Sequence, residues 1–188
     1  MREWAAGLLA VGAVACSAHR EASAPAGTGG SGLAAAAPTA SNRKYVDPEL
    51  GFEVARPTGD WQLDASGEFT SEGIAIPVVL RHRDSGAQVV IQVAPAIATP
   101  TQFAERLVSG LRSYGGFTAS DPEPLPLSDD AVGFRFALED KVLGRIAVRA
   151  GGSGKVLMLV ATWPADASAA VTEGVDQIFI SVRPFPSS

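Results

Sequence analysis

The sequence has little cysteine and little histidine. Cys16 is the only cysteine among 188 residues, so the chain forms no internal disulfide and no cysteine-based zinc cluster. His19 and His82 are the only histidines, which leaves few ligands for a transition metal. We therefore expect neither a metal nor another cofactor.

Runs of basic residues are also missing. The formal net charge is −5, and the chain has no run of lysine or arginine. Domains that bind nucleic acid usually present a basic patch or stripe. We therefore expect no nucleic-acid partner.

No apolar run is long enough to cross a bilayer, which needs roughly 20 residues. The apolar run of residues 4–15 is shorter, follows Arg2, and ends in the small-x-small pattern of Ala13 and Ala15 that a signal peptidase reads. The sequence therefore predicts that residues 1–15 are a lipoprotein signal peptide.

Cys16 follows this pattern directly, so cleavage before it would make it the first residue of the mature protein. Ala13 stands where the lipoprotein pattern usually has leucine. We predict that Cys16 is acylated, with palmitate among its acyl chains, because two or more chains give stable anchoring. The expected location is the bacterial cell envelope, on the outer membrane or another leaflet that faces the periplasm.

Between Cys16 and residue 43, alanine, glycine, serine and proline dominate. Such a composition buries too little apolar surface to offset the entropy of ordering the chain. Residues 16–42 are therefore predicted to be the lipidated cysteine and a flexible linker.

Residues 43–188 carry the periodic patterns of a folded domain. Thr99 and Gln102 form a capping box around Pro100, which predicts a helix that ends at Gly115 and Gly116. The other predicted elements are a pair of short strands around the turn 47–51, strands at 78–83, 88–94, 132–138, 143–150 and 155–162, and a helix at 166–182. The predicted fold is α+β, a mostly antiparallel sheet of about six strands packed with two helices, with Trp61 and Trp163 as core anchors.

Two segments resemble PsbP-like domains. The opening YVDPELGFEVARPTGDW, residues 45–61, has the aromatic-x-Asp, Gly-Phe and Pro-x-x-x-Trp signature, and VDQIFISVRPF, residues 175–185, is similar to the terminal helix of that group. The resemblance implies an α/β/α sandwich shared by photosystem extrinsic subunits, a Ran-binding import factor and bacterial envelope lipoproteins of the DcrB and LpqN kind. Because the family has no shared catalytic residues, it also implies a binding or accessory protein that is not an enzyme.

Catalytic motifs fail on their spacing. The segment GGSGKV has Arg149 and Val156 where a phosphate-binding loop needs glycine and Ser or Thr, so it reads as a hairpin turn. A Ser-His-acid triad would have to use His82, and no Gly-x-Ser-x-Gly elbow is present. The acidic pairs 129–130 and 139–140 lie next to strand ends, and the segment 120–130 is interpreted as an exposed loop.

Arg81, His82, Arg83 and Asp84 gather two cations, an imidazole and a carboxylate within four residues. Such a group is a candidate contact for a phosphate, a carboxylate or a protein partner. On a strand, however, alternate residues point to opposite faces, and charges at a hairpin end are usually solvated or protect the sheet edge.

Three functions remain open from the sequence. The first is a lipoprotein, attached to the membrane through Cys16, that binds a protein or another envelope component. The second is a small-molecule carrier with a pocket between sheet and helices, which a contiguous apolar cavity with a few polar groups would favour. The third is a hydrolase using His82, which would need a serine and an acid within hydrogen-bond reach.

Overall fold

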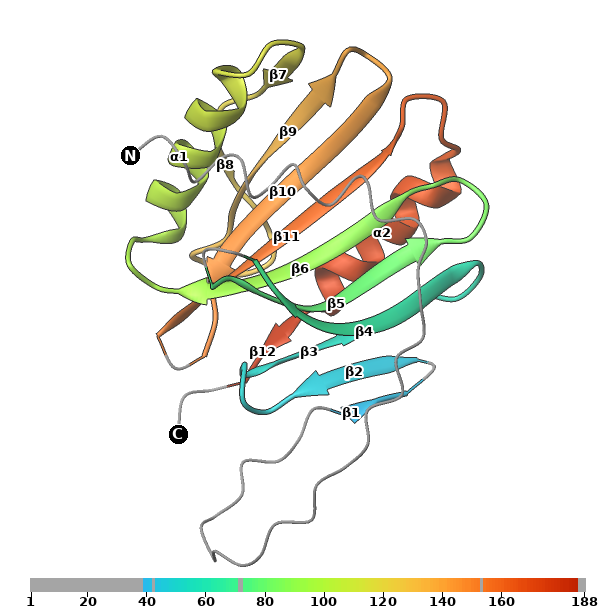
Figure 1. The fold of residues 1–188 in the computed structure, drawn as a ribbon, viewed down its shortest axis with the longest axis vertical. Helices are drawn as coiled ribbons and strands as arrows, with labels where there is room; N and C mark the ends of the chain where they lie inside the picture. The colour runs from blue at the N-terminus through green and yellow to red at the C-terminus, as the bar shows by residue number, and fades with distance from the viewer. Residues whose placement is uncertain (1–38, 42, 71–72, 153, 186–188) are drawn as a thin grey trace, which may run out of the picture.

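The computed structural model describes residues 39–41, 43–70, 73–152 and 154–185 (Figure 1). Within these residues, twelve strands form two antiparallel sheets that pack with two helices. The α+β class expected from the sequence is confirmed. None of the described helices has the length and apolar character needed to span a bilayer.

The larger sheet has eight strands in the order β4-β5-β6-β11-β10-β9-β7, with β8 paired to β9 as well. Its strands are β4 (Trp61–Phe69), β5 (Ala75–His82), β6 (Gln88–Pro95), β7 (Phe117–Ala119), β8 (Glu123–Pro124), β9 (Val132–Leu138), β10 (Val142–Ala150) and β11 (Lys155–Pro164). Neighbouring strands of this order are joined by hairpins except at β6–β11 and at β9–β7, and β11 lies in the middle of the order.

The smaller sheet has the order β1-β2-β3-β12 and lies beside the β4 edge of the larger one (Figure 1). Its strands are β1 (Thr39–Ala40), β2 (Lys44–Asp47), β3 (Phe52–Ala55) and β12 (Arg183–Pro184). The predicted turn between β2 and β3 is present, with Leu50 N–H donating to Asp47 Oδ1 at 2.8 Å and Gly51 at a φ of 76°. Strand β1 lies at the end of the segment predicted as linker.

The prediction of about six strands was too low. Strand β4 was missed because it is an edge strand that exposes most of its length, so it lacks the apolar alternation of a half-buried strand. The other missed strands have two or three residues each: β1, β7, β8 and β12.

The two helices lie on opposite faces of the larger sheet. Helix α1 (Pro100–Arg112) begins at the predicted capping box, in which Thr99 Oγ1 accepts from Gln102 N–H at 3.2 Å. It ends before the two glycines, at the cap residue Ser113. Helix α2 (Ala169–Ser181) starts three residues later than predicted. Figure 1 shows α1 near β7, β9 and β10, and α2 behind β6 and β11.

Each face of the sheet has its own core. On the α2 face, alternate residues of β6 such as Val89 and Ile91 pack with α2, the smaller sheet and Trp61, which is 2% exposed. On the α1 face, Phe103, Val108 and Leu111 pack against strand residues of β9, β10 and β11. Residues 89–94 of β6 are all buried, and the sequence of the strand is accordingly nearly continuous in apolar residues.

Candidate functional site

Helix α1 is too short to cover its face of the sheet. Its 13 residues span about 20 Å, whereas β10 and β11, with 9 and 10 residues, span about 30 Å. The helix covers the end that carries Ala94, Val132 and Val156. The opposite end of the same face carries the turns between β5 and β6 and between β9 and β10, and it has no helix above it.

An apolar groove of about 320 Å³ lies over this uncovered end. One side comes from α1, β7 and β9 through Leu111, Phe117 and Phe136, and the opposite side from β6 and β11 through Val90 and Val160. All of the charged residues of the described chain lie outside its lining. The groove therefore offers a ligand a mostly apolar surface and no counter-charge from the described residues of its lining.

Gln92 is the unusual residue of this groove. It lies in β6 opposite Met158 and is only 2% exposed, yet it lines the groove. Its Oε1 is buried and has no hydrogen-bond partner in the described part of the chain. A buried acceptor left unpaired costs about 1–3 kcal/mol, and native proteins keep few of them.

Two further polar side chains lie nearer the hairpin end. Gln88 and Thr162 are direct partners across the β6–β11 pairing, and both line the groove half-buried. The site therefore combines an apolar surface with the buried side chain of Gln92 and a partly exposed polar pair. Small-molecule sites usually have a mostly apolar wall with a few polar groups.

The sequence did not single out Gln92. In the alternation of β6, a glutamine reads as a residue on a solvated face. The available signal was its position, since Gln92 stands inside the apolar run VVIQVA, and a nearly continuous apolar run is typical of a strand buried on both faces.

The predicted cluster of residues 81–84 is split between the end of β5 and the following turn. Arg81 donates to Asp64 on β4 at 2.6 Å between Nη1 and Oδ2, with both side chains about half exposed. In the hydrogen-bonded orientation of its amide, the Gln62 oxygen lies 3.0 Å from Arg83 Nη2. The two arginines thus attach the hairpin end to the edge strand, while Asp84 is exposed in the turn.

His82 points away from those charges and packs on Trp61. The two rings meet edge to face, with centroids 5.4 Å apart and an angle of 78°. His82 Nδ1 is buried and receives no hydrogen bond from the described residues. A serine–histidine–acid triad uses both ring nitrogens, so His82 does not form one here. The described residues also contain no group of three or more metal-ligating side chains.

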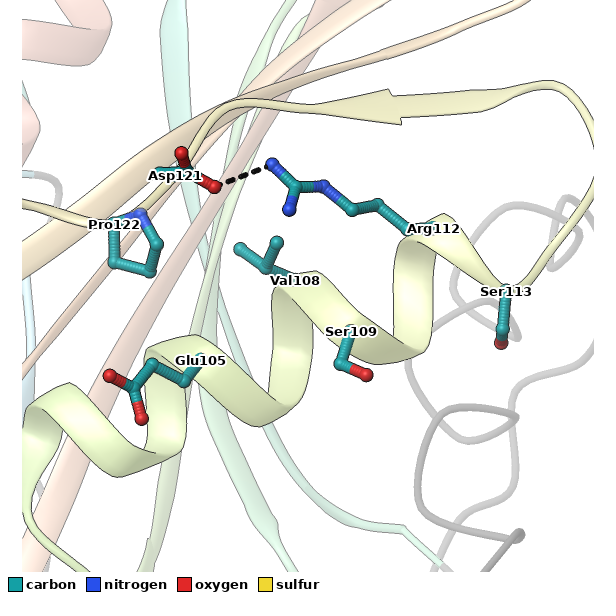
Figure 2. A pocket seen from close by; sticks show the side chains of 7 residues that line it. All are labelled: Glu105, Val108, Ser109, Arg112, Ser113, Asp121 and Pro122. Carbon is teal, nitrogen blue, oxygen red and sulfur yellow. Dashed lines mark hydrogen bonds and ion pairs between the residues drawn. The ribbon is translucent and has the colours of Figure 1, made fainter.

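A second depression, of about 470 Å³, lies between α1 and the segment that follows β7. Figure 2 shows Arg112 and Asp121 facing each other across it, with Val108 pointing toward the same space. Arg112 donates to Asp121 Oδ1 at 2.8 Å and to the Ala119 carbonyl at 2.8 Å and 3.2 Å. Its guanidinium thus holds Ala119 and Asp121 against the helix.

The predicted loop 120–130 is only partly exposed. Leu125 and Leu127 pack against the core on the α2 face, and β8 pairs with β9. Asp130 accepts from Ser128 Oγ at 2.6 Å and from Ala150 N–H at 2.7 Å, so one acid of the pair 129–130 has a structural role. Cys16, His19 and the predicted linker up to residue 38 lie outside the described residues.

No family model matches this sequence, and no curated protein sequence matches it. Among solved structures, the solution structure of cyanobacterial PsbP (CyanoP) from Synechocystis sp. PCC 6803 aligns with 85% of this chain and 98% of that one, at 19% identity and a TM-score of 0.49. Similarity at this level carries no argument about function. The fold class rests on the sheets and helices described above, which form the sandwich of a sheet between two helices that the PsbP-like signature implied.

Proposed function

We propose that this chain is an exported lipoprotein whose domain is a non-enzymatic binding module for a small apolar component of the cell envelope. The ligand occupies the groove between the end of α1 and the uncovered part of the sheet. The observation that supports this proposal is a groove of about 320 Å³ whose lining is mostly apolar, has no charged side chain, and includes the polar side chains of Gln88, Gln92 and Thr162. A ligand would cover apolar surface that α1 leaves open.

The size of the groove agrees with a small ligand. Its volume of about 320 Å³ lies near the lower end of the roughly 300–1,000 Å³ typical of ligand pockets. This favours the small-molecule carrier over a hydrolase, because the groove wall offers no histidine, acid or lysine from the described residues to act as acid or base. Thr162 has a hydroxyl but no basic neighbour in the groove lining to activate it.

Binding of the neutral fluorescent dye Nile red tests this function. The protein for the assay is the full chain with Cys16→Ser, which cannot be acylated. Thr162→Trp fills the groove from β11, whereas Thr118→Trp places the same side chain at an exposed position of β7. We expect saturable dye binding by the parent and by Thr118→Trp, and a loss of affinity of about ten-fold or more in Thr162→Trp.

Circular dichroism and thermal unfolding verify that each variant is folded. If the parent shows no saturable binding, or if a folded Thr162→Trp binds the dye as tightly as Thr118→Trp, the groove is not a binding site.

The membrane attachment rests on the sequence alone. A signal-like segment, a single cysteine directly after it and a linker of small residues support acylation of Cys16. In bacteria fed a labelled palmitate, the wild type and Ser17→Ala should carry label and sediment with membranes. Cys16→Ser should carry no label and stay in the soluble fraction. Equal membrane retention of Cys16→Ser together with an unlabelled wild type would contradict the anchor.

A further inference from the structure

We infer that the ligand of the groove is an amphiphile whose single anionic head group, such as a carboxylate, lies on Arg81 and Arg83. Its apolar chain lies in the groove. The inference rests on the proposed function and names the class of ligand. It places the two arginines, which stand out in the sequence, at the rim of the groove.

One row of directly paired residues leads from the groove to Arg81. The pairings join Phe136 on β9 to Gly144, Gly144 to Thr162, Thr162 to Gln88, and Gln88 to Arg81 on β5. Direct partners of an antiparallel pair lie on the same face of the sheet, with Cβ atoms about 5 Å apart. Phe136, Thr162 and Gln88 line the groove, so Arg81 continues their row one strand beyond the lining.

Arg83 brings a second guanidinium to the same place. In the hydrogen-bonded orientation of its amide, the Gln62 oxygen lies 3.0 Å from Arg83 Nη2 and 3.2 Å from Arg83 Nε. Gln62 is also the direct partner of Arg81 across the pairing of β4 and β5. Both arginines therefore adjoin Gln62, next to the polar end of the groove.

Both side chains are exposed and keep donors for a ligand. Arg81 uses Nη1 for Asp64 at 2.6 Å, and its Nε and Nη2 donate to none of the described residues. Within the described residues, Arg83 forms no ion pair, although Asp84 follows it in the turn. A guanidinium carries five N–H donors in a planar fork that matches a carboxylate.

The position of the charge fixes how the ligand lies. A charged group inside the groove would lose its hydration without a counter-ion, because the described lining has no charged side chain. At the rim the head group stays hydrated and meets the two guanidinium groups. The row from Phe136 to Arg81 crosses four strand spacings of about 4.8 Å, so a ligand lying along it is elongated.

The volume of the groove sets the size of the probes. Its 320 Å³ correspond to about ten water molecules of liquid, each occupying about 30 Å³. Three probes with an alkyl chain of about ten carbons therefore differ only in the head group: decanoate, decanol and decyltrimethylammonium. Each displaces Nile red from the full chain carrying Cys16→Ser, at a pH of about 8 where decanoate is ionised.

We expect the parent to bind decanoate about ten-fold more tightly than decyltrimethylammonium, because the guanidinium groups attract one head group and repel the other. Raising sodium chloride from about 0.05 M to about 0.5 M should weaken the binding of decanoate and leave that of decanol unchanged, since salt screens exposed charges.

The double variant Arg81→Gln with Arg83→Gln removes both charges and keeps exposed polar side chains. Its affinity for decanoate should fall about ten-fold, whereas decanol and Nile red should bind as in the parent. Arg43→Gln with Arg183→Gln removes the same number of charges at exposed positions next to β2 and in β12, on the smaller sheet. This control should keep the parent affinity for all three probes.

The outcomes distinguish the two proposals. If the dye and all three probes fail to bind the parent, the proposed function fails and this inference fails with it. If decanoate and decyltrimethylammonium bind the parent equally, or if the folded Arg81→Gln, Arg83→Gln variant keeps the parent affinity for decanoate, the groove binds ligands but the arginines do not select them. The comparison of probes on the parent needs no variant, so a misfolded variant does not protect the inference.

Discussion

The ring of Phe136 lies against Gly144, its direct partner across the pairing of β9 and β10. A Cβ placed on Gly144 would lie 2.2 Å from Cζ of Phe136 and 2.8 Å from the carbonyl oxygen of Ala161. Because glycine has no side chain, the aromatic ring can lie down on the strand and form part of the groove wall. The absence of one methyl group therefore helps to keep the groove open.

Gly144→Ala should destabilise the protein and narrow the groove. The added methyl must displace the Phe136 ring and also meets backbone that cannot move easily, and overpacking of this kind costs about 1–3 kcal/mol. Urea unfolding measures this loss, and Nile red binding should weaken in the same variant. Gly115→Ala, where a Cβ meets nothing within 4 Å, is the matched control and should be as stable as the parent or slightly more so. Equal stabilities for the two variants would show that the ring moves without cost.

Tyr45→Phe should remove a contribution to stability that depends on pH. Tyr45 donates to Asp47 Oδ2 at 2.8 Å inside the smaller sheet. Burial raises the pKa of the Tyr45 hydroxyl well above its ordinary value of 10.0, and the hydrogen bond and charge of Asp47 raise it further. Near neutral pH, loss of this donor should cost about 1–3 kcal/mol because a buried carboxylate oxygen is left unpaired.

The pH dependence follows from the sign of that shift. Above about pH 10 the unfolded chain loses the tyrosine proton while the folded chain keeps it, so the wild type becomes less stable as pH rises. The phenylalanine variant has no such group at position 45. The difference in unfolding free energy between the two proteins should therefore shrink above about pH 10. A difference that stays constant from neutral pH upward would contradict the role of the Tyr45 hydroxyl.

The parts of the fold that were predicted from the sequence are determined by residues close together in the chain. Thr99, Pro100 and Gln102 carry the whole signal for the start of α1 within four residues, and the structure has the helix there. The hairpin of β5 and β6 was also found, because two apolar strands flank a short turn containing Gly86. These signals need no information from distant parts of the chain.

The groove was not predictable in this way, since it results from a mismatch between elements far apart in the sequence. Which end of the sheet α1 covers depends on the loop after β6 and on packing against β9 and β10. Gln92 comes into the groove lining through the position of β6 beside β11, which the sequence alone did not give. The candidate cluster at residues 81–84 was visible in the sequence, but its cross-strand contacts with Gln62 and Asp64 needed the missed strand β4.

Asp130→Asn should weaken the protein near neutral pH and less so in acid. Burial alone would raise the pKa of the Asp130 carboxyl, but hydrogen bonds from Ser128 and from the Ala150 N–H, together with the charge of Arg149, lower it below its ordinary value of 3.8. The carboxylate therefore contributes stability above about pH 4 that is lost as pH falls through the lowered pKa. Because Asp130 is exposed, we expect a cost of only about 1 kcal/mol near neutral pH.

Urea unfolding at several pH values measures this effect. The wild type and Asp130→Asn should differ near neutral pH and converge as the pH falls through the lowered pKa of Asp130, because the carboxyl is then protonated in both the folded and the unfolded wild type. Asp129→Asn changes the exposed neighbour and should stay within about 0.5 kcal/mol of the wild type at neutral pH. If the two asparagine variants are equally stable, the contacts of Asp130 are not a significant source of stability.

Substitutions at His82 and Arg81 should show that the histidine stabilises the fold more than the surface arginine does. His82→Ala removes the edge-to-face contact with Trp61 and leaves a gap beside a core residue. Aromatic pairs contribute about 0.5–1.5 kcal/mol beyond the area they bury, so the variant should lose at least about 1 kcal/mol. Arg81→Ala breaks an exposed ion pair with Asp64 and should lose less than about 1 kcal/mol. Nile red binding should be unchanged in both variants, because neither residue lines the groove. If Arg81→Ala keeps its stability but loses affinity for this uncharged dye ten-fold, the cluster of residues 81–84 is instead part of the groove itself.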